Sequence, residues 1–403
     1  MQTSAQTYSG AIFDCDTHLF EKADAWTRYL PEKFKEEWSG GHRKDEDGQW
    51  RLYMGKRRVM LGEGHASGDG SIPRPGSLKA YLKALKNGDA FDMRASKTED
   101  MLSHGARLRK MDEFGVEGCI VFIGEHVSMF GYLDDDIEAA NAVHHAYNQY
   151  LLDEWQFNVD ERIYTTPVLT LGDLDASIRE TDWIIRNGAR IVIMPVGPTP
   201  VGRSPADVYY DPVWARLNEA GVRIAYHIAE APYMHAMMRQ WGEVPLQSRI
   251  KQSAWVWLNA YRTVPIIQTL SSLIFYNFFE RFPNIKVISA ENGAEWVPGL
   301  LNDMDKCRGM ARNADWPCGQ LKRRPSELFK QNVYVVAYPE DDLEKIVAEV
   351  GSSNWLVMGS DYPHAEGVPT PRDFFAEACG GLTPQQVQGI MYDNGRRFLP
   401  RVV

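Results

Sequence analysis

The stretch that decides the fold lies near the C-terminal end of the chain, and it reads Asn354-Trp355-Leu356-Val357-Met358-Gly359-Ser360-Asp361-Tyr362-Pro363-His364. The apolar run 355–358 predicts a short buried strand that stops at Gly359, and Asp361 follows two residues later. In a barrel of parallel strands, residues just past a strand's C-terminal end point into the active-site mouth. Taken alone, Asp361 is more typical of a helix N-cap or an Asx turn.

The rest of the chain repeats this pattern. Short apolar runs, many of them rich in β-branched residues, predict eight strands in all, at 11–18, 119–123, 163–169, 190–194, 222–227, 285–290, 333–336 and 355–358. Most of the intervals between them carry apolar residues at helical spacing. Strands of this kind that alternate with helices form a parallel sheet, and eight of them predict a closed (β/α)8 TIM barrel. No repeat or linker divides the chain, so residues 1–403 are predicted to form one domain.

One long insertion follows the first strand. Residues 22–100 have mixed character, and the part from Gly62 to Gly76 holds five glycines and two prolines, which predicts no regular element there. Long irregular insertions in compact domains are usually functional or disordered. Its place directly after a strand end predicts a lid over the site.

Composition excludes several classes of protein. A net charge of -10 argues against a nucleic-acid partner bound by a basic surface. The five cysteines are scattered without a CxxC pair, which indicates neither a disulfide framework nor a zinc knuckle. The polar N-terminus and the lack of an apolar run of about 20 residues predict no signal peptide and no membrane partner. We therefore expect a cytoplasmic protein.

Acids and imidazoles stand at four of the predicted strand ends. Asp16 and His18 leave the same face of the first strand, and His227, Glu291 and Asp361 follow the fifth, sixth and eighth strands. Singly, His227 is more typical of a hydrogen-bonded core histidine, and Glu291 of a helix cap. Their recurrence at one end of a barrel favours a metal site. Imidazole with carboxylate suits Zn, Mn or Fe rather than Mg or Ca.

Several motifs carry a family resemblance. They are Asp16-x-His18-x-x-Glu21, the segment from Arg107 to Glu117, Phe282 to Val287 followed by Glu291 to Pro298, Gly359 to His364, and Asp393 to Arg397. Together they resemble the amidohydrolase superfamily, and are most similar to its branch with aminocarboxymuconate-semialdehyde decarboxylase and the resorcylate decarboxylases. The resemblance covers most of the chain outside the insertion. It implies a divalent metal (Zn, Mn or Fe) held by Asp16, His18, His227 and Asp361.

The chain departs from this family pattern at one catalytic position. Those decarboxylases have a histidine after strand six, where this chain has Glu291, and the strand-four lysine of the binuclear hydrolases is missing. Glu291 is then either a general base or a further metal ligand that admits two metals. The main hypothesis is a metal-dependent hydrolase or decarboxylase. The alternatives are a non-haem di-iron monooxygenase, with two Fe, that hydroxylates a bulky terpenoid- or steroid-like acid or its thioester, and a non-catalytic metal-binding barrel.

Further residues are predicted to serve this site. Asp361 and His364 join Glu291 as catalytic candidates, and the substrate-binding candidates are Glu125, His126, Trp255 and Trp296. Surface or capping roles explain Glu125 and His126 equally well. Dense methionines and aromatics between 231 and 265 predict a bulky, largely apolar organic acid or ester as the small-molecule substrate, although helix packing explains most of them. The apolar helix predicted at 266–282 suits a homodimer interface or core packing equally.

Overall fold

Eight parallel strands form the centre of the computed structural model, which describes residues 8–59, 70–133, 135–228, 232–243 and 252–401. They are β1 (Ile12–His18), β7 (Val116–Phe122), β9 (Ile163–Thr165), β10 (Ile191–Ile193), β11 (Arg223–His227), β12 (Val287–Ala290), β13 (Val333–Val336) and β14 (Leu356–Val357). Nearly every strand residue is buried, because helices cover the outer face and side chains fill the inside.

The strands close into a barrel. One sheet contains β1, β7 and β9, which the short antiparallel β8 (Asn158–Val159) extends, and the other runs from β10 to β14 in chain order. Val168 pairs with Ile193 across one seam, and Thr17 pairs with Tyr362 across the other. A backbone hydrogen bond of 3.0 Å from the amide of Cys15 to the carbonyl of Met358 strengthens the second seam. The predicted (β/α)8 barrel is therefore confirmed.

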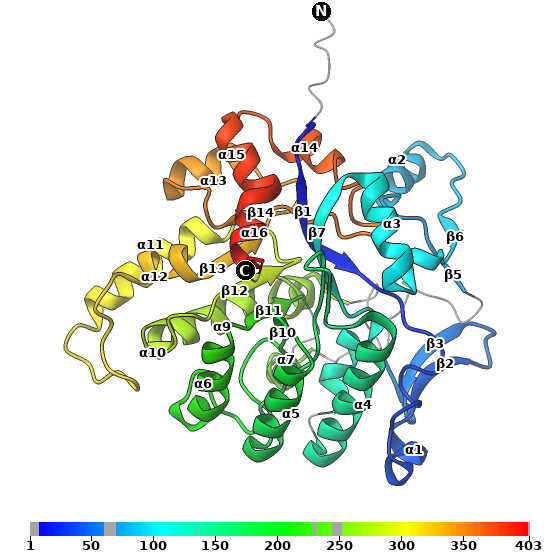
Figure 1. Ribbon diagram of the computed structural model, residues 1–403, viewed down its shortest axis with the longest axis horizontal. Coiled ribbons are helices and arrows are strands. Elements are labelled where there is room, and N and C mark those ends of the chain that lie inside the picture. Colours follow the sequence, from blue (N-terminus) through cyan, green and yellow to red (C-terminus); the bar gives the residue numbers. More distant parts are fainter. Residues whose placement is uncertain (1–7, 60–69, 134, 229–231, 244–251, 402–403) are drawn as a thin grey trace, which may run out of the picture.

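Helices surround the strands, as Figure 1 shows. They are α3 (His104–Phe114), α4 (Ile137–Trp155), α5 (Leu174–Arg186), α6 (Asp211–Ala220), α7 (Pro232–Gln240), α8 (Ala254–Val256), α9 (Val264–Phe275), α10 (Phe278–Arg281), α11 (Val297–Met310), α12 (Pro325–Asn332), α13 (Leu343–Val350), α14 (Asp373–Ala378), α15 (Pro384–Gln388) and α16 (Asn394–Phe398). Short 3-10 or π turns lie at 99–101, 125–132, 208–210, 257–261 and 389–393. None of the described helices combines the length and the apolarity that a membrane span needs.

The prediction of a single helix at 266–282 was wrong. Asn277 takes a left-handed backbone conformation with φ of 54°, which a continuous right-handed helix does not accommodate, so the segment splits into α9 and α10. The apolar side chains of α9 include Ile266, Leu270 and Leu273, which are fully buried in this chain. Core packing thus accounts for their character, and a homodimer stays a prediction.

The insertion after β1 is more regular than expected. It contains α1 (Glu32–Trp38), an antiparallel sheet of β2 (Gly40–Lys44), β3 (Trp50–Met54) and β4 (Arg57–Arg58), then β5 (Ser71–Pro73), α2 (Leu78–Asn87) and β6 (Arg94–Ser96). The prediction of no regular element across 62–76 was wrong at β5, which pairs with β6, and residues 60–69 lie outside the described residues.

The insertion is fastened to the loop after β14. The amide of Gly76 donates to the carbonyl of His364 at 3.0 Å, and that of Leu78 donates to Ala365 at 2.9 Å. In Figure 1 the small sheet of the insertion lies at one side of the barrel, near α4, on which α1 packs. Its role as a lid stays a prediction.

Candidate metal centre

The five predicted metal ligands meet at the C-terminal ends of the strands. Asp16 and His18 stand on β1, His227 ends β11, Glu291 follows β12, and Asp361 follows β14. Two backbone hydrogen bonds fix the loop after β14 against β1. They run from the amide of Asp361 to the carbonyl of Asp16 at 2.8 Å, and from His18 to Tyr362 at 2.7 Å.

The two histidines turn their Nε2 atoms toward each other. Nδ1 of His227 lies 2.8 Å from the carbonyl of Ile228, and Nδ1 of His18 lies 3.4 Å from that of Ile123. A carbonyl only accepts, so in each neutral ring the proton is on Nδ1 and Nε2 has a lone pair. The two Nε2 atoms are 3.2 Å apart. Two lone pairs at this distance repel one another unless a proton or a cation lies between them.

Carboxylates complete the cluster. Oδ1 of Asp16 lies 3.4 Å from Nε2 of His18 and 3.6 Å from Nε2 of His227, and it is buried without a hydrogen bond. Glu291 approaches Nε2 of His227 at 3.1 Å, and Asp361 approaches Nε2 of His18 at 3.4 Å. Ligand atoms within 4.8 Å of one another form two overlapping groups, Asp16-His18-His227 and His18-Glu291-Asp361-His364.

The electrostatics of the protein alone are those of a site that needs positive charge. Burial would lower the pKa of His227, but the carboxylates of Asp16 and Glu291 outweigh it and hold that pKa well above its usual range. Burial raises the pKa of Asp361 well above normal, and Glu291 adds to this. Burial, with His364 nearby, lowers the pKa of His18 to about 4. Three acids share one buried space, and a divalent cation would balance their charge.

Two of the ligand-bearing turns are held in an unusual backbone conformation. Glu291 and Asp361 have φ of 54° and 56°, which non-glycine residues rarely adopt. The hydroxyl of Tyr338 donates to the carbonyl of Glu291 at 2.6 Å, and a Cβ on Gly293 would lie 2.5 Å from the Tyr338 ring. Asp341 accepts from the amides of both Ala294 and Tyr338 at 2.8 Å, which joins the two loops. Sequence reasoning missed Tyr338 and Asp341, because nothing in the pattern connects the loop after β13 with Glu291.

His364 joins the cluster as predicted. Its Nδ1 lies 2.8 Å from Oδ1 of Asp361, and its ring stacks on that of His18 at 4.1 Å between centroids. Burial would lower the pKa of His364, but Asp361 raises it to about 9.

The four predicted substrate residues make their side-chain contacts with residues other than the five predicted ligands. Oε1 of Glu125 is hydrogen-bonded to Nε2 of His42 in the insertion at 3.0 Å, while His126 is fully buried against His144. The indole N–H of Trp296 donates to the carbonyls of the 292–293 turn, and half-buried Trp255 packs on exposed Trp241. Among the described residues, none of the four belongs to either of the two overlapping groups of possible metal ligands, which we call the metal-type groups. Their contact with substrate stays a prediction.

Comparison with known families agrees with this arrangement. The family model described as "Amidohydrolase" matches residues 13–401. The chain belongs to the amidohydrolase family. No match was found among curated proteins.

Solved structures similar to this amidohydrolase include an amidohydrolase from Mycobacterium avium subsp. paratuberculosis K-10, with 28% identity, a TM-score of 0.82, and 98% of this chain and 99% of that chain covered. The 5-carboxyvanillate decarboxylase of Sphingomonas paucimobilis has 19% identity and a TM-score of 0.56, with 76% and 84% covered. A dihydroxybenzoic acid decarboxylase from Polaromonas sp. JS666, solved with manganese and an inhibitor, has 17% identity and a TM-score of 0.55, with 81% and 91% covered. The last two likenesses show the fold.

The residues of this amidohydrolase fit a divalent metal. Asp16, His18 and His227 direct an unpartnered carboxylate oxygen and two imidazole nitrogens at one point, and the carboxylate oxygen of Asp361 is the fourth ligand atom. This mixed nitrogen and oxygen set suits Zn, Mn or Fe. Both metal-type groups contain His18, whose Nδ1 faces a carbonyl, so its single available nitrogen serves one metal only. A second metal would depend on Glu291, Asp361 and His364.

Proposed function

We propose that this protein is a metal-dependent enzyme that hydrolyses or decarboxylates an organic acid or ester. One observation carries the proposal, namely the two imidazole Nε2 atoms that face each other at 3.2 Å beside Oδ1 of Asp16, which is buried without a hydrogen bond. A buried cluster of this composition is costly to keep without a cation. In the proposed site Asp16, His18, His227 and Asp361 hold one ion, which supplies Lewis-acid polarisation of a substrate oxygen.

Glu291 is the proposed acid–base group. Its Oε2 lies 3.1 Å from His227, and its turn is held by Tyr338, so its carboxylate is fixed beside the cluster. In a hydrolysis Glu291 would take a proton from water and return it to the leaving group. In a decarboxylation it would take a proton from water and deliver it to the carbon that loses carbon dioxide, and the hydroxide left behind would combine with the carbon dioxide as bicarbonate. The Nδ1–H of His364 would orient Asp361, whose Oδ1 accepts it at 2.8 Å.

The proposed substrate is bulky and largely apolar. Trp255 with Trp241, and Trp257 with Tyr261, form two aromatic pairs in the segment after β11, and Trp241 is 70% exposed. Met234 and Met238 of the same segment are buried in the core, so packing explains them. Residues 231 and 244–251 lie outside the described residues. Competition binding of a polycyclic acid against benzoate tests this class, and a preference for benzoate contradicts it.

The first test combines metal analysis with Glu291→Gln. We expect about one Zn, Mn or Fe per chain in both the wild type and the variant, because the glutamine side chain keeps the shape of the glutamate and the metal has four other ligands. Turnover should fall by about 10²- to 10⁴-fold, the range for loss of a general acid or base. A variant with full activity would exclude Glu291 as the acid–base group.

The second candidate function is di-iron oxygenation. The excess of donors over one metal favours it, since Glu291, Asp361 and His364 form a group beside the first three ligands. It predicts about two Fe per chain in the wild type and one in Glu291→Gln, together with oxygen consumption during turnover. Full turnover under strict anaerobiosis would exclude oxygenation, whereas hydrolysis and decarboxylation need no oxygen.

A further inference from the structure

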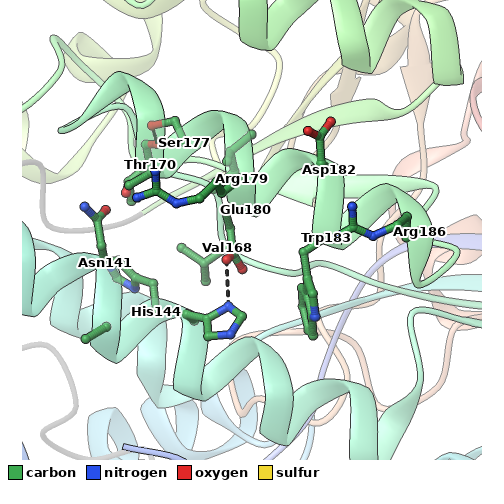
Figure 2. A pocket seen from close by; sticks show the side chains of 14 residues that line it. Asn141, His144, Val168, Thr170, Ser177, Arg179, Glu180, Asp182, Trp183 and Arg186 are labelled. Carbon is green, nitrogen blue, oxygen red and sulfur yellow. Dashed lines mark hydrogen bonds and ion pairs between the residues drawn. The ribbon is translucent and has the colours of Figure 1, made fainter. Parts of the chain in front are cut away.

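A cavity lies between α4, α5 and residues 168–170 after β9. It has a volume of about 510 Å³, and Figure 2 shows its lining. The residues that matter here are Asn141, His144 and His145 on α4 and Arg179, Glu180 and Arg186 on α5. The lining contains none of the five predicted ligands and not His364, so the cavity is separate from the candidate metal centre.

A chain of hydrogen bonds fixes the proton of His144. The indole N–H of Trp26 can only donate, and it lies 3.2 Å from Nδ1 of His126. Neutral His126 therefore has its proton on Nε2, which lies 3.1 Å from Nδ1 of His144. His144 accepts there and must have its own proton on Nε2. Burial lowers the pKa of His144 to about 3, so the ring is neutral, and no described residue accepts the Nε2 proton.

The acceptors of the cavity are already in use. One oxygen of Glu180 accepts from Nδ2 of Asn148 and the other pairs with Nδ1 of His145, both at 2.7 Å. This second contact is the dashed line in Figure 2. Asp182 is paired with Arg216 at 2.9 Å. Both carboxylates of the lining are thus engaged in an ion pair or a hydrogen bond.

The donors are free to bind. Within the described residues, Arg179 and Arg186 form no ion pair or hydrogen bond, and neither does the side-chain amide of Asn141. The two arginines are seven residues apart on α5, which places them on one face of the helix at a rise of about 10 Å. Figure 2 shows Arg179 directed toward Thr170 and Arg186 next to Trp183. The two carboxylates of the lining, Glu180 and Asp182, are already paired, so among the described residues the two arginines are the unpaired charges of the cavity.

We propose that this cavity binds a small oxyanion, a carboxylate or a phosphate, through Arg179 and Arg186. Guanidinium groups bind both kinds of oxyanion with charge-assisted, often bidentate hydrogen bonds. His144 adds a neutral N–H from the floor, and the side chain of Asn141 adds an amide. The spacing of the arginines suits an anion with two acidic groups, or one compact dianion toward which both long side chains converge.

The test uses calorimetric titration of the metal-loaded protein at low salt with inorganic phosphate and, separately, with succinate. We expect at least one of them to bind, and Arg179→Gln/Arg186→Gln to weaken that binding by at least about tenfold, since each lost charge-assisted bond has this order of effect. Arg312→Gln is the matched control, because Arg312 is exposed after α11 and outside the cavity. It should bind the anion like the wild type.

A second variant separates this cavity from the metal. Because phosphate and carboxylates also bind metals, the titration is repeated with His18→Gln, which removes a proposed ligand. Binding that persists in His18→Gln and is lost in the double arginine variant supports the proposal. Preference for succinate identifies a dicarboxylate site, and preference for phosphate a phosphate site. Unchanged binding in the double variant, or no binding of either anion to the wild type, overturns it.

Discussion

Two histidine pairs in this protein have almost the same geometry and opposite chemistry. In the candidate metal centre, Nε2 of His18 and Nε2 of His227 are 3.2 Å apart, and outside the barrel strands Nε2 of His126 and Nδ1 of His144 are 3.1 Å apart. All four rings are buried. The difference lies in what the other ring nitrogens contact. Carbonyls face Nδ1 of His18 and His227, whereas an indole N–H faces Nδ1 of His126.

The outer partners decide which pair needs a cation. The Trp26 N–H faces Nδ1 of His126, so the proton of that ring is on Nε2 and points to Nδ1 of His144. The His126–His144 pair is therefore an ordinary hydrogen bond. Acceptors at both ends of the His18 pair leave no proton between two neutral rings, so an added proton or a cation must lie there, beside the carboxylates of Asp16 and Glu291. Distance alone therefore does not distinguish a metal site from a structural pair.

The largest expected difference is in metal content and turnover. His18→Gln removes a proposed ligand, and we expect the metal to fall from about one per chain to near none and turnover to fall more than about 100-fold, since even outer partners of metal ligands are worth 10- to 100-fold. His126→Gln, the matched variant in the other pair, should keep its metal. Elemental analysis and steady-state kinetics measure both, and equal metal loss in the two variants would refute the contrast.

Removal of the metal should also affect the thermal stability of variants in the two pairs differently. Because the ion binds the folded cluster, chelation should lower the midpoint of thermal unfolding of the wild type, and a free metal concentration 100 times the dissociation constant corresponds to about 2.7 kcal/mol. His126→Gln should show the same shift, and His18→Gln should show almost none. Thermal scans with and without chelator measure this. A shift in His18→Gln equal to that of the wild type would place the metal elsewhere.

The His126–His144 pair should control acid stability instead. Burial, with His144 nearby, holds the pKa of His126 well below normal, and burial lowers that of His144 to about 3, so the unfolded chain binds their protons at a higher pH than the folded one. Their contribution to the free energy of unfolding should fall as pH drops from about 6.5 toward 3, by up to about 1.4 kcal/mol per pH unit for each ring. Urea unfolding of the wild type and His126→Gln/His144→Gln across this range measures it. Parallel pH curves would be the contrary result.

The smallest effect concerns the donor at the end of that pair. Trp26→Phe removes the indole N–H and leaves Nδ1 of His126 buried without a partner, which should destabilise the fold by about 1–3 kcal/mol. Metal content should not change. Trp296→Phe is the comparison variant near the His18–His227 pair, because the Trp296 N–H donates to the turn after Glu291. Chemical unfolding and elemental analysis test both, and metal loss in Trp26→Phe would connect the two pairs.

Much of this could be predicted from local pattern. All eight strands were found, because a barrel strand is buried on both faces and its apolar run is visible without knowledge of its neighbours. Asp16, His18, His227, Glu291 and Asp361 were found together because parallel strands deliver their C-terminal residues to one rim. The break at Asn277 was not found, since left-handed backbone leaves only a weak signal at asparagine.

What the amino-acid sequence determined by itself was the barrel and the set of acids and imidazoles that meet at one of its ends. These follow from periodicity and residue type, which are local properties. The tertiary structure decided the rest, because protonation depends on partners that are distant in the chain. Trp26 sets the proton of His126 from 100 residues away, Tyr338 holds the Glu291 turn from 47 residues away, and α4 and α5 together form the cavity with its two arginines. Residue types show which groups can ionise, but only folding determines where each proton resides.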